Sequence, residues 1–187
     1  KEKKIRNFFM NYLSFFEYGV FQVDKNKFLK CSQELKIEIL KKILTTSSGK
    51  IFPPRELSII NIIKLIQSNQ CFRHTLHSCL LEVNSKKISI FREISSIKEV
   101  KKIIPKGKSY LWDNRFFLYS KSFKIECERI TIENWVFLKK YFSFKKNHLN
   151  FLILSSLPLI KIKNKLNIPF LSLNDVDYDF YFKPTIP

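Results

Sequence analysis

Residues 49–55, 75–79 and 111–116 read Gly-Lys-Ile-Phe-Pro-Pro-Arg, Thr-Leu-His-Ser-Cys and Leu-Trp-Asp-Asn-Arg-Phe. Gly49 is typical of a left-handed helix end. Pro53 and Pro54 are typical of a helix start, because a proline in the first turn lacks only an N–H that has no helical partner. After Thr75 the apolar residues change from helical to strand spacing. The segment therefore predicts helices first and mainly strands afterwards.

Two amphipathic helices are predicted on either side of Gly49. Ser32 is typical of an N-cap for a helix over 33–46. The second helix follows the two prolines and ends at 68–69. Its expected buried residues are Leu57, Ile60, Ile63 and Ile66. The basic and aromatic stretch 1–17 predicts a further helix, followed by a short strand over 18–23 and a turn at 24–26.

The rest of the chain is predicted to be richer in strands. The expected strands cover residues 80–83, 87–92, 109–112, 115–119, 123–130, 152–159 and 170–173. Short helices are expected over 96–104 and from Thr131, a candidate N-cap, to 142. The break at Pro105-Lys-Gly107 is the expected domain boundary. The predicted class is α+β, with a helical unit carrying short strands over 1–104 and a small, sheet-rich mixed unit over 105–187.

Composition indicates a folded, strongly basic chain. Of its 187 residues 45% are hydrophobic, including 19 Phe, and 34 Lys plus Arg face 16 Asp plus Glu, a net charge of +18. Such an excess favours a polyanionic partner, with nucleic acid first. Coding bias is the alternative, because Ala is absent and Gly occurs only three times. No stretch is apolar enough for a membrane-spanning helix or a signal peptide.

Metal and nucleotide sites are not predicted. Four cysteines include no C-x-x-C pair, and we expect reduced thiols rather than zinc ligands in the cluster Cys71, His74, His77 and Cys79. Alternating Asp175, Asp177 and Asp179 could hold Mg²⁺, but an exposed edge strand is favoured. The three glycines are isolated, so no phosphate-cradling loop is present, and no catalytic residue is assigned.

The ordered series of residues 49–116 resembles the carboxy-terminal half of tRNA(Ile)-lysidine synthases of the alphaproteobacterial or organellar type. The resemblance covers residues 18–118 and continues more weakly to the final Pro184-Thr-Ile-Pro187. It implies part of a ligase that uses ATP to join lysine to the wobble cytidine of isoleucine tRNA, in a bacterial cytoplasm or an organelle matrix. ATP would be bound by an amino-terminal ATP-pyrophosphatase domain, whose Ser-Gly-Gly-x-Asp-Ser loop this chain lacks.

The resemblance also implies contacts with tRNA. The expected residues are Lys50, Arg55, Arg73, Arg92, Trp112 and Arg115. Structural alternatives stay open: Arg55 could pair with Glu56 or Glu93, and Trp112 and Phe116 could form the core of a hairpin. The family has Thr-Leu-Gly-Gly-Cys where this chain has His77 and Ser78, which puts a tight, phosphate-cradling turn there in doubt.

Three functions are therefore compared. The first is the tRNA-binding part of a lysidine synthase, working with an ATP-pyrophosphatase domain in cis or in trans, with a homodimer left open. The second is a non-enzymatic RNA-binding or ribosome-associated protein that has lost the ATP domain. A structural module whose charge reflects coding bias alone predicts no RNA binding. Because the chain begins at Lys1 and not at Met, we expect it to start inside a larger gene product.

Overall fold

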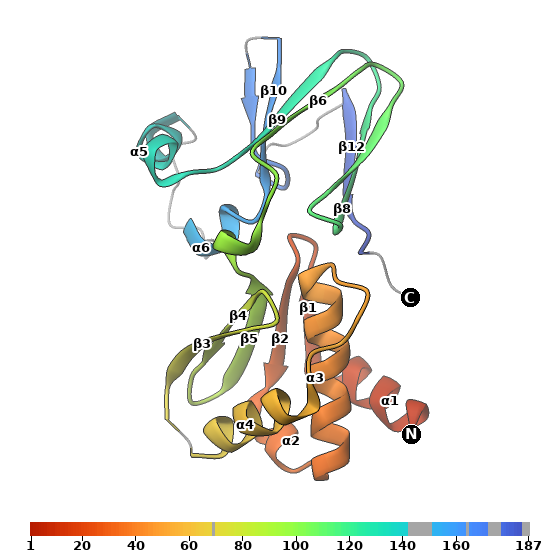
Figure 1. Cartoon of the computed structure of the whole chain (residues 1–187), viewed down its shortest axis with the longest axis vertical. Coiled ribbons are helices and arrows are strands. Elements are labelled where there is room, and N and C mark those ends of the chain that lie inside the picture. The colour runs from red at the N-terminus through yellow and green to blue at the C-terminus, as the bar shows by residue number, and fades with distance from the viewer. Residues whose placement is uncertain (69, 142–150, 164, 172–176, 185–187) are drawn as a thin grey trace. The chain divides into compact units, whose positions relative to one another are not determined.

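Helices and antiparallel sheets make up the computed structural model (Figure 1), which describes residues 1–68, 70–141, 151–163, 165–171 and 177–184. The predicted α+β class is confirmed. The chain divides into a first unit, Lys1–Arg92 together with Pro184, and a second unit, Glu93–Lys183. The boundary expected from the sequence, after residue 104, lies inside the second unit.

The first unit is built on a five-stranded antiparallel sheet. The strands lie in the order β1-β2-β5-β4-β3, with bounds Leu13–Phe16, Val20–Asp24, Lys87–Arg92, Cys79–Val83 and Phe72–Leu76. The helices are α1 (Glu2–Tyr12), α2 (Lys25–Leu29), α3 (Gln33–Ser48) and α4 (Glu56–Gln67). Helix α3 packs against β2, β4 and β5, and α1 and α4 pack against α3 (Figure 1).

Helix α3 begins and ends where local chemistry predicts. The Ser32 side chain accepts a hydrogen bond from the Leu35 amide at 3.3 Å, and Gly49 closes the helix in the left-handed region at φ 66°. Between these caps, Ile39, Leu40, Ile43 and Leu44 are buried. Both predicted caps are confirmed, because each depends only on neighbouring backbone atoms.

Helix α4 follows the two prolines as predicted, with Arg55 at its N-cap, but its buried face is rotated from the predicted one. The buried residues are Ile59, Ile62, Ile63 and Ile66. The prediction was wrong for Leu57, which is 70% exposed. An all-apolar run offers several stripes at helical spacing, and the packing against α3 selects among them.

The β3–β4 turn keeps a tight geometry without glycine. His77 and Ser78 have φ of 54° and 61°, and Leu76 pairs with Cys79, so these two residues form the whole loop. Positive φ at both positions is the geometry of a type I′ hairpin, which usually takes Gly or Asn. The turn therefore stays tight with side chains at both positions.

Two elements of the first unit were predicted wrongly. A turn was expected at 24–26, but Asp24 is the N-cap of α2. A single helix was expected over 1–17, but α1 ends at Tyr12 and Leu13–Phe16 form β1. Strand β1 pairs with β2 across a turn in which Gly19 has φ 81°. Pairing with β2 adds ladder hydrogen bonds that helical periodicity alone does not reveal.

The second unit contains two antiparallel sheets. One has the order β11-β10-β9-β6, with bounds Lys165–Asn167, Pro158–Ile162, Ile125–Arg129 and Lys101–Ile104. The other has the order β12-β8-β7, with bounds Tyr178–Phe182, Phe116–Ser120 and Ser109–Trp112. The helices are the short 3₁₀ turn η1 (Ile94–Ser96), α5 (Ile132–Tyr141) and α6 (Phe151–Leu154).

Three expectations for the second unit were wrong. The first two residues of the strand expected over 170–173 form a turn. The helix expected over 96–104 is replaced by η1 and by β6, which pairs with β9 along a run rich in β-branched residues. The strand expected over 152–159 is split between α6 and β10. The Thr131 cap is confirmed, because its hydroxyl accepts from the Asn134 amide at 3.4 Å. Residues 142 and 172–173 lie outside the described ranges.

The left-handed turn gives a stability prediction with a built-in control. Ser78→Gly should stabilise the chain by about 0.5–1 kcal/mol, because a non-glycine residue with positive φ is strained. Ser89→Gly, the same change inside β5, should destabilise it by a similar amount. Urea unfolding followed by circular dichroism measures both. A loss of stability in Ser78→Gly would contradict the strain at the turn.

Candidate nucleic-acid interface

The loop after α3 and the β3–β4 turn bring several predicted residues together. The His77 ring donates a hydrogen bond to the Phe52 carbonyl, and the charges of Lys50 and Arg92 act on the same ring. Arg92 Nη1 donates to the Ser78 carbonyl at 3.2 Å. We call Lys50, Phe52, His77 and Arg92 the Lys50–Arg92 cluster. Two cations and a histidine thus converge from segments that are distant in sequence.

The pKa of His77 is lowered within the Lys50–Arg92 cluster. Burial lowers this pKa most, and the charges of Lys50 and Arg92 lower it further, against the opposing hydrogen bond to Phe52. The folded pKa is thus below the ordinary 6.5, so the neutral ring stabilises the fold above that pH. This stability falls as pH drops from 6.5 through the folded-state pKa. The part of the lowering that comes from Lys50 and Arg92 reflects a positive potential at the ring, and such a potential favours an approaching anion.

The predicted arginines of the first unit differ in how far they are available. Lys50 and Arg55 are exposed, whereas Arg92 is only 6% exposed. Arg73 is exposed but pairs with Glu82 at 2.6 Å. Glu56 pairs with Lys41 at 2.8 Å, and among the described residues Arg55 has no ion pair. The cations most open to a ligand are therefore Lys50 and Arg55.

Trp112 and Arg115 are placed differently from the expected tRNA contacts. Both side chains are fully buried. Arg115 Nε lies 2.7 Å from Asp113 Oδ2, its Nη2 donates to the Ser156 carbonyl at 3.0 Å, and its guanidinium lies over the Phe116 ring. Trp112 and Phe116 pair across the β7–β8 turn, as the hairpin alternative has it. Neither predicted residue has surface to offer to tRNA.

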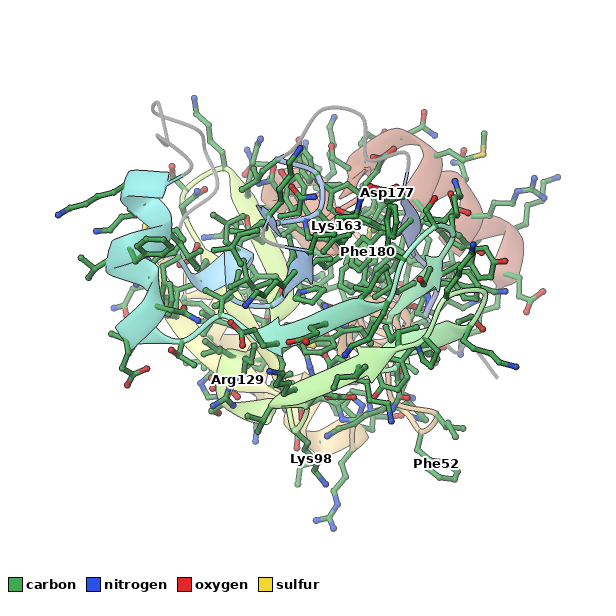
Figure 2. The ribbon with its side chains drawn as sticks, turned by 90° about the horizontal axis from the view of Figure 1, so that it is seen from above. Phe52, Lys98, Arg129, Lys163, Asp177 and Phe180 are labelled. Atoms are coloured by element: carbon green, nitrogen blue, oxygen red, sulfur yellow. The ribbon has the colours of Figure 1, made fainter. Side chains whose placement is uncertain are left out.

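A second basic surface lies at strands β9 and β10 of the second unit. A depression of about 350 Å³ is lined by Phe123, Lys124, Glu126, Lys161 and Lys163. Lys163, labelled in Figure 2, lies with its Nζ 3.7 Å from the centre of the Phe123 ring. Lys101 is 3.1 Å from Glu126 and, with Lys124 and Lys161, lowers the pKa of that carboxyl. The cations here outnumber the acid that they share.

Metal ligation has no support among the described residues, where no group of three or more His, Cys, Asp or Glu could hold an ion. The four cysteines are free; Cys71 is exposed, and Cys79 and Cys127 are buried. Burial raises the pKa of Cys127 to about 12. Asp179 pairs with Lys121 at 2.5 Å, and Asp175 lies outside the described ranges.

Comparison with known proteins shows that the chain is similar to tRNA(Ile)-lysidine synthases. The chain is 35% identical over 172 residues to the tRNA(Ile)-lysidine synthase of Rickettsia typhi, which covers 87% of this chain and 39% of that protein. The Rickettsia akari enzyme is 34% identical over the same shares, and that of Rickettsia rickettsii (strain Sheila Smith) is 32% identical over 182 residues, 90% and 37%. The resemblance to tRNA(Ile)-lysidine synthases is confirmed.

The similarity covers most of this chain but only part of each lysidine synthase. The chain spans less than two-fifths of the length of these relatives. No family model and no solved structure matches it. Within the described residues, none of the helices is both long and apolar enough to cross a membrane.

Two participants were not recognised from the sequence. His77 was named there only as a departure from the family's glycine and as a rejected metal ligand, and Phe52 was not singled out at all. The available signal for Phe52 is its position between Lys50 and the two prolines, in the short stretch between two predicted helices.

The shared field of the Lys50–Arg92 cluster can be tested by titration. Lys50→Gln should raise the pKa of His77, because it removes one of the two positive charges that lower it. Lys64→Gln, on the exposed side of α4, should leave that pKa unchanged. NMR titration of the ring protons gives the values, with His77→Gln assigning the signal. Equal shifts in both lysine variants would contradict the convergence.

The buried ion pair of the second unit predicts a large stability effect. Arg115→Met leaves the Asp113 carboxylate buried without its partner and should cost about 3–5 kcal/mol. Arg73→Met breaks an exposed pair and should cost about 0–1 kcal/mol. Denaturant unfolding compares them. A loss in Arg115→Met as small as the one expected for Arg73→Met would contradict a structural role for Arg115.

Proposed function

We propose that this chain is the tRNA-binding part of a tRNA(Ile)-lysidine synthase, in which a separate ATP-pyrophosphatase domain activates the wobble cytidine and lysine is joined to it. The similarity to three Rickettsia lysidine synthases supports this most strongly. The chain would act where the tRNA is found, in a bacterial cytoplasm or an organelle matrix. ATP would bind to the other domain, present in cis or in trans.

The charge distribution supports a role in holding RNA. A net charge of +18 attracts a polyanion over long range, and contacts to phosphates release counterions, so the affinity should fall steeply with salt. The Lys50–Arg92 cluster offers converging cations in the first unit, with Arg55 beside it at the start of α4. The basic surface around Lys161 would add backbone contacts from the second unit.

The roles of the six residues expected from the sequence are proposed accordingly. Lys50 and Arg55 would contact phosphates directly, and Arg92 would add its field from beneath the turn. Arg73 would contribute after exchanging its partner Glu82 for RNA. Trp112 and Arg115 would support the β7–β8 hairpin, because burial keeps both side chains from RNA.

Binding of tRNA at different salt concentrations tests the proposal. Lys50→Gln/Arg55→Gln should weaken tRNA binding by about tenfold at low salt and reduce the slope of log affinity against log salt by about 1–2. Lys42→Gln/Lys64→Gln removes the same charge from exposed positions on α3 and α4 and should change the slope much less. Salt-insensitive binding, equal for tRNA and a neutral polymer, would overturn the proposal.

A reconstitution separates the enzyme role from RNA binding alone. The chain combined with an ATP-pyrophosphatase domain should form lysidine on isoleucine tRNA, with ATP and lysine present, at a higher rate than that domain alone. Strong RNA binding with no stimulation would instead favour the non-enzymatic, ribosome-associated alternative.

A further inference from the structure

The side chain of Phe52 is unusually open for an aromatic residue. It is 78% exposed, and Figure 2 shows it directed outward from its loop. Its neighbour Ile51 is also exposed. Exposed apolar residues that gather at one place mark an interaction site more often than isolated ones do. The loop between α3 and α4 therefore offers a ring for contact.

The backbone beneath the ring is held in place. Gly49 ends α3 in a fixed left-handed conformation, and Pro53 and Pro54 restrict the chain before α4 begins. Pro54 is buried, and the Phe52 carbonyl accepts a hydrogen bond from His77 across the β3–β4 turn. A loop ordered before binding loses little conformational entropy when a ligand arrives. The ring is thus presented on a preorganised support.

Charge around the ring selects the partner. Lys50 and Arg55 flank Phe52 in sequence. Arg92 donates a hydrogen bond to Ser78 in the β3–β4 turn, and His77 of the same turn donates to the Phe52 carbonyl. The nearest acid along the chain, Glu56, is already paired with Lys41 at 2.8 Å. An anionic ligand with a flat, apolar face satisfies both features. A nucleotide has this combination, because its base can stack while its phosphate meets the cations.

We infer that Phe52 is a stacking platform for one unpaired nucleotide of the bound RNA, whose flanking phosphate is held by Lys50 and Arg55. The inference rests on the proposed function and adds a single-stranded contact to it. A base paired within a duplex cannot present its face to the ring, whereas an overhanging or looped-out base can. A protein partner is the less favoured occupant, because the cations beside the ring then have no assigned ligand.

Full-length chain and two RNA hairpins test the inference. The hairpins share one stem, closed by a non-nucleotide linker so that no loop base is unpaired, and one of them ends in a short single-stranded 3′ overhang. Phe52→Ala should weaken binding of the overhang hairpin by about fivefold to 100-fold, the loss measured when a stacking ring is removed. Binding of the blunt hairpin should be unchanged. Phe52→Trp should keep the affinity, whereas Phe52→Leu, which has no ring, should lose it.

Leu57→Ala is the matched control, because Leu57 is 70% exposed at the start of the neighbouring helix and should affect neither hairpin. Thermal unfolding checks that each variant folds, which is expected for an exposed side chain. Unchanged overhang binding in Phe52→Ala, or full affinity in Phe52→Leu, would overturn the inference and is the result that a protein-contacting ring gives. Absence of salt-dependent RNA binding in the unaltered chain would instead remove the proposed function.

Discussion

Packing of α3 against the five-stranded sheet is the constraint on which the Lys50–Arg92 cluster depends. The last turns of α3 are buried at Ile43 and Leu44, and the Cys79 thiol contacts the Leu44 carbonyl at 3.7 Å. Lys50 follows Leu44 closely in the chain, and His77 precedes Cys79. Fixing Leu44 against Cys79 therefore brings the loop and the turn together, although nothing in either segment alone requires it.

The same reasoning explains which features could be predicted from the sequence. Helix ends depend on atoms only a few residues away, so the residue types at these positions are enough to predict them. This holds for the Ser32 cap, the Gly49 terminus and the Thr131 cap. Strands β1 and β6 depend on partners elsewhere in the chain, and the local pattern favoured helices there. Sequence found Lys50 and Arg92 as candidates but could not show that both act on His77.

The arginine residues show most clearly what could not be predicted from the sequence. Arg55, Arg73 and Arg115 look alike in a sequence, yet one is exposed without an ion pair among the described residues, one is paired at the surface and one is buried. Their difference is set by the position of Glu82 and Asp113 across a hairpin or turn. Net charge gives the overall field, whereas the placement of the acids decides where that field remains open.

The four cysteine thiols differ in exposure, and among them only that of Cys71 is exposed. Cys79 and Cys127 are buried, and burial raises the pKa of the Cys31 and Cys127 thiols, so the thiolate of these two forms less readily. Cys71 is exposed just before β3, the strand that leads to His77. A maleimide dye should therefore attach selectively to Cys71 without any engineered substitution. The dye would then be an optical reporter beside β3, the strand that leads into the β3–β4 turn.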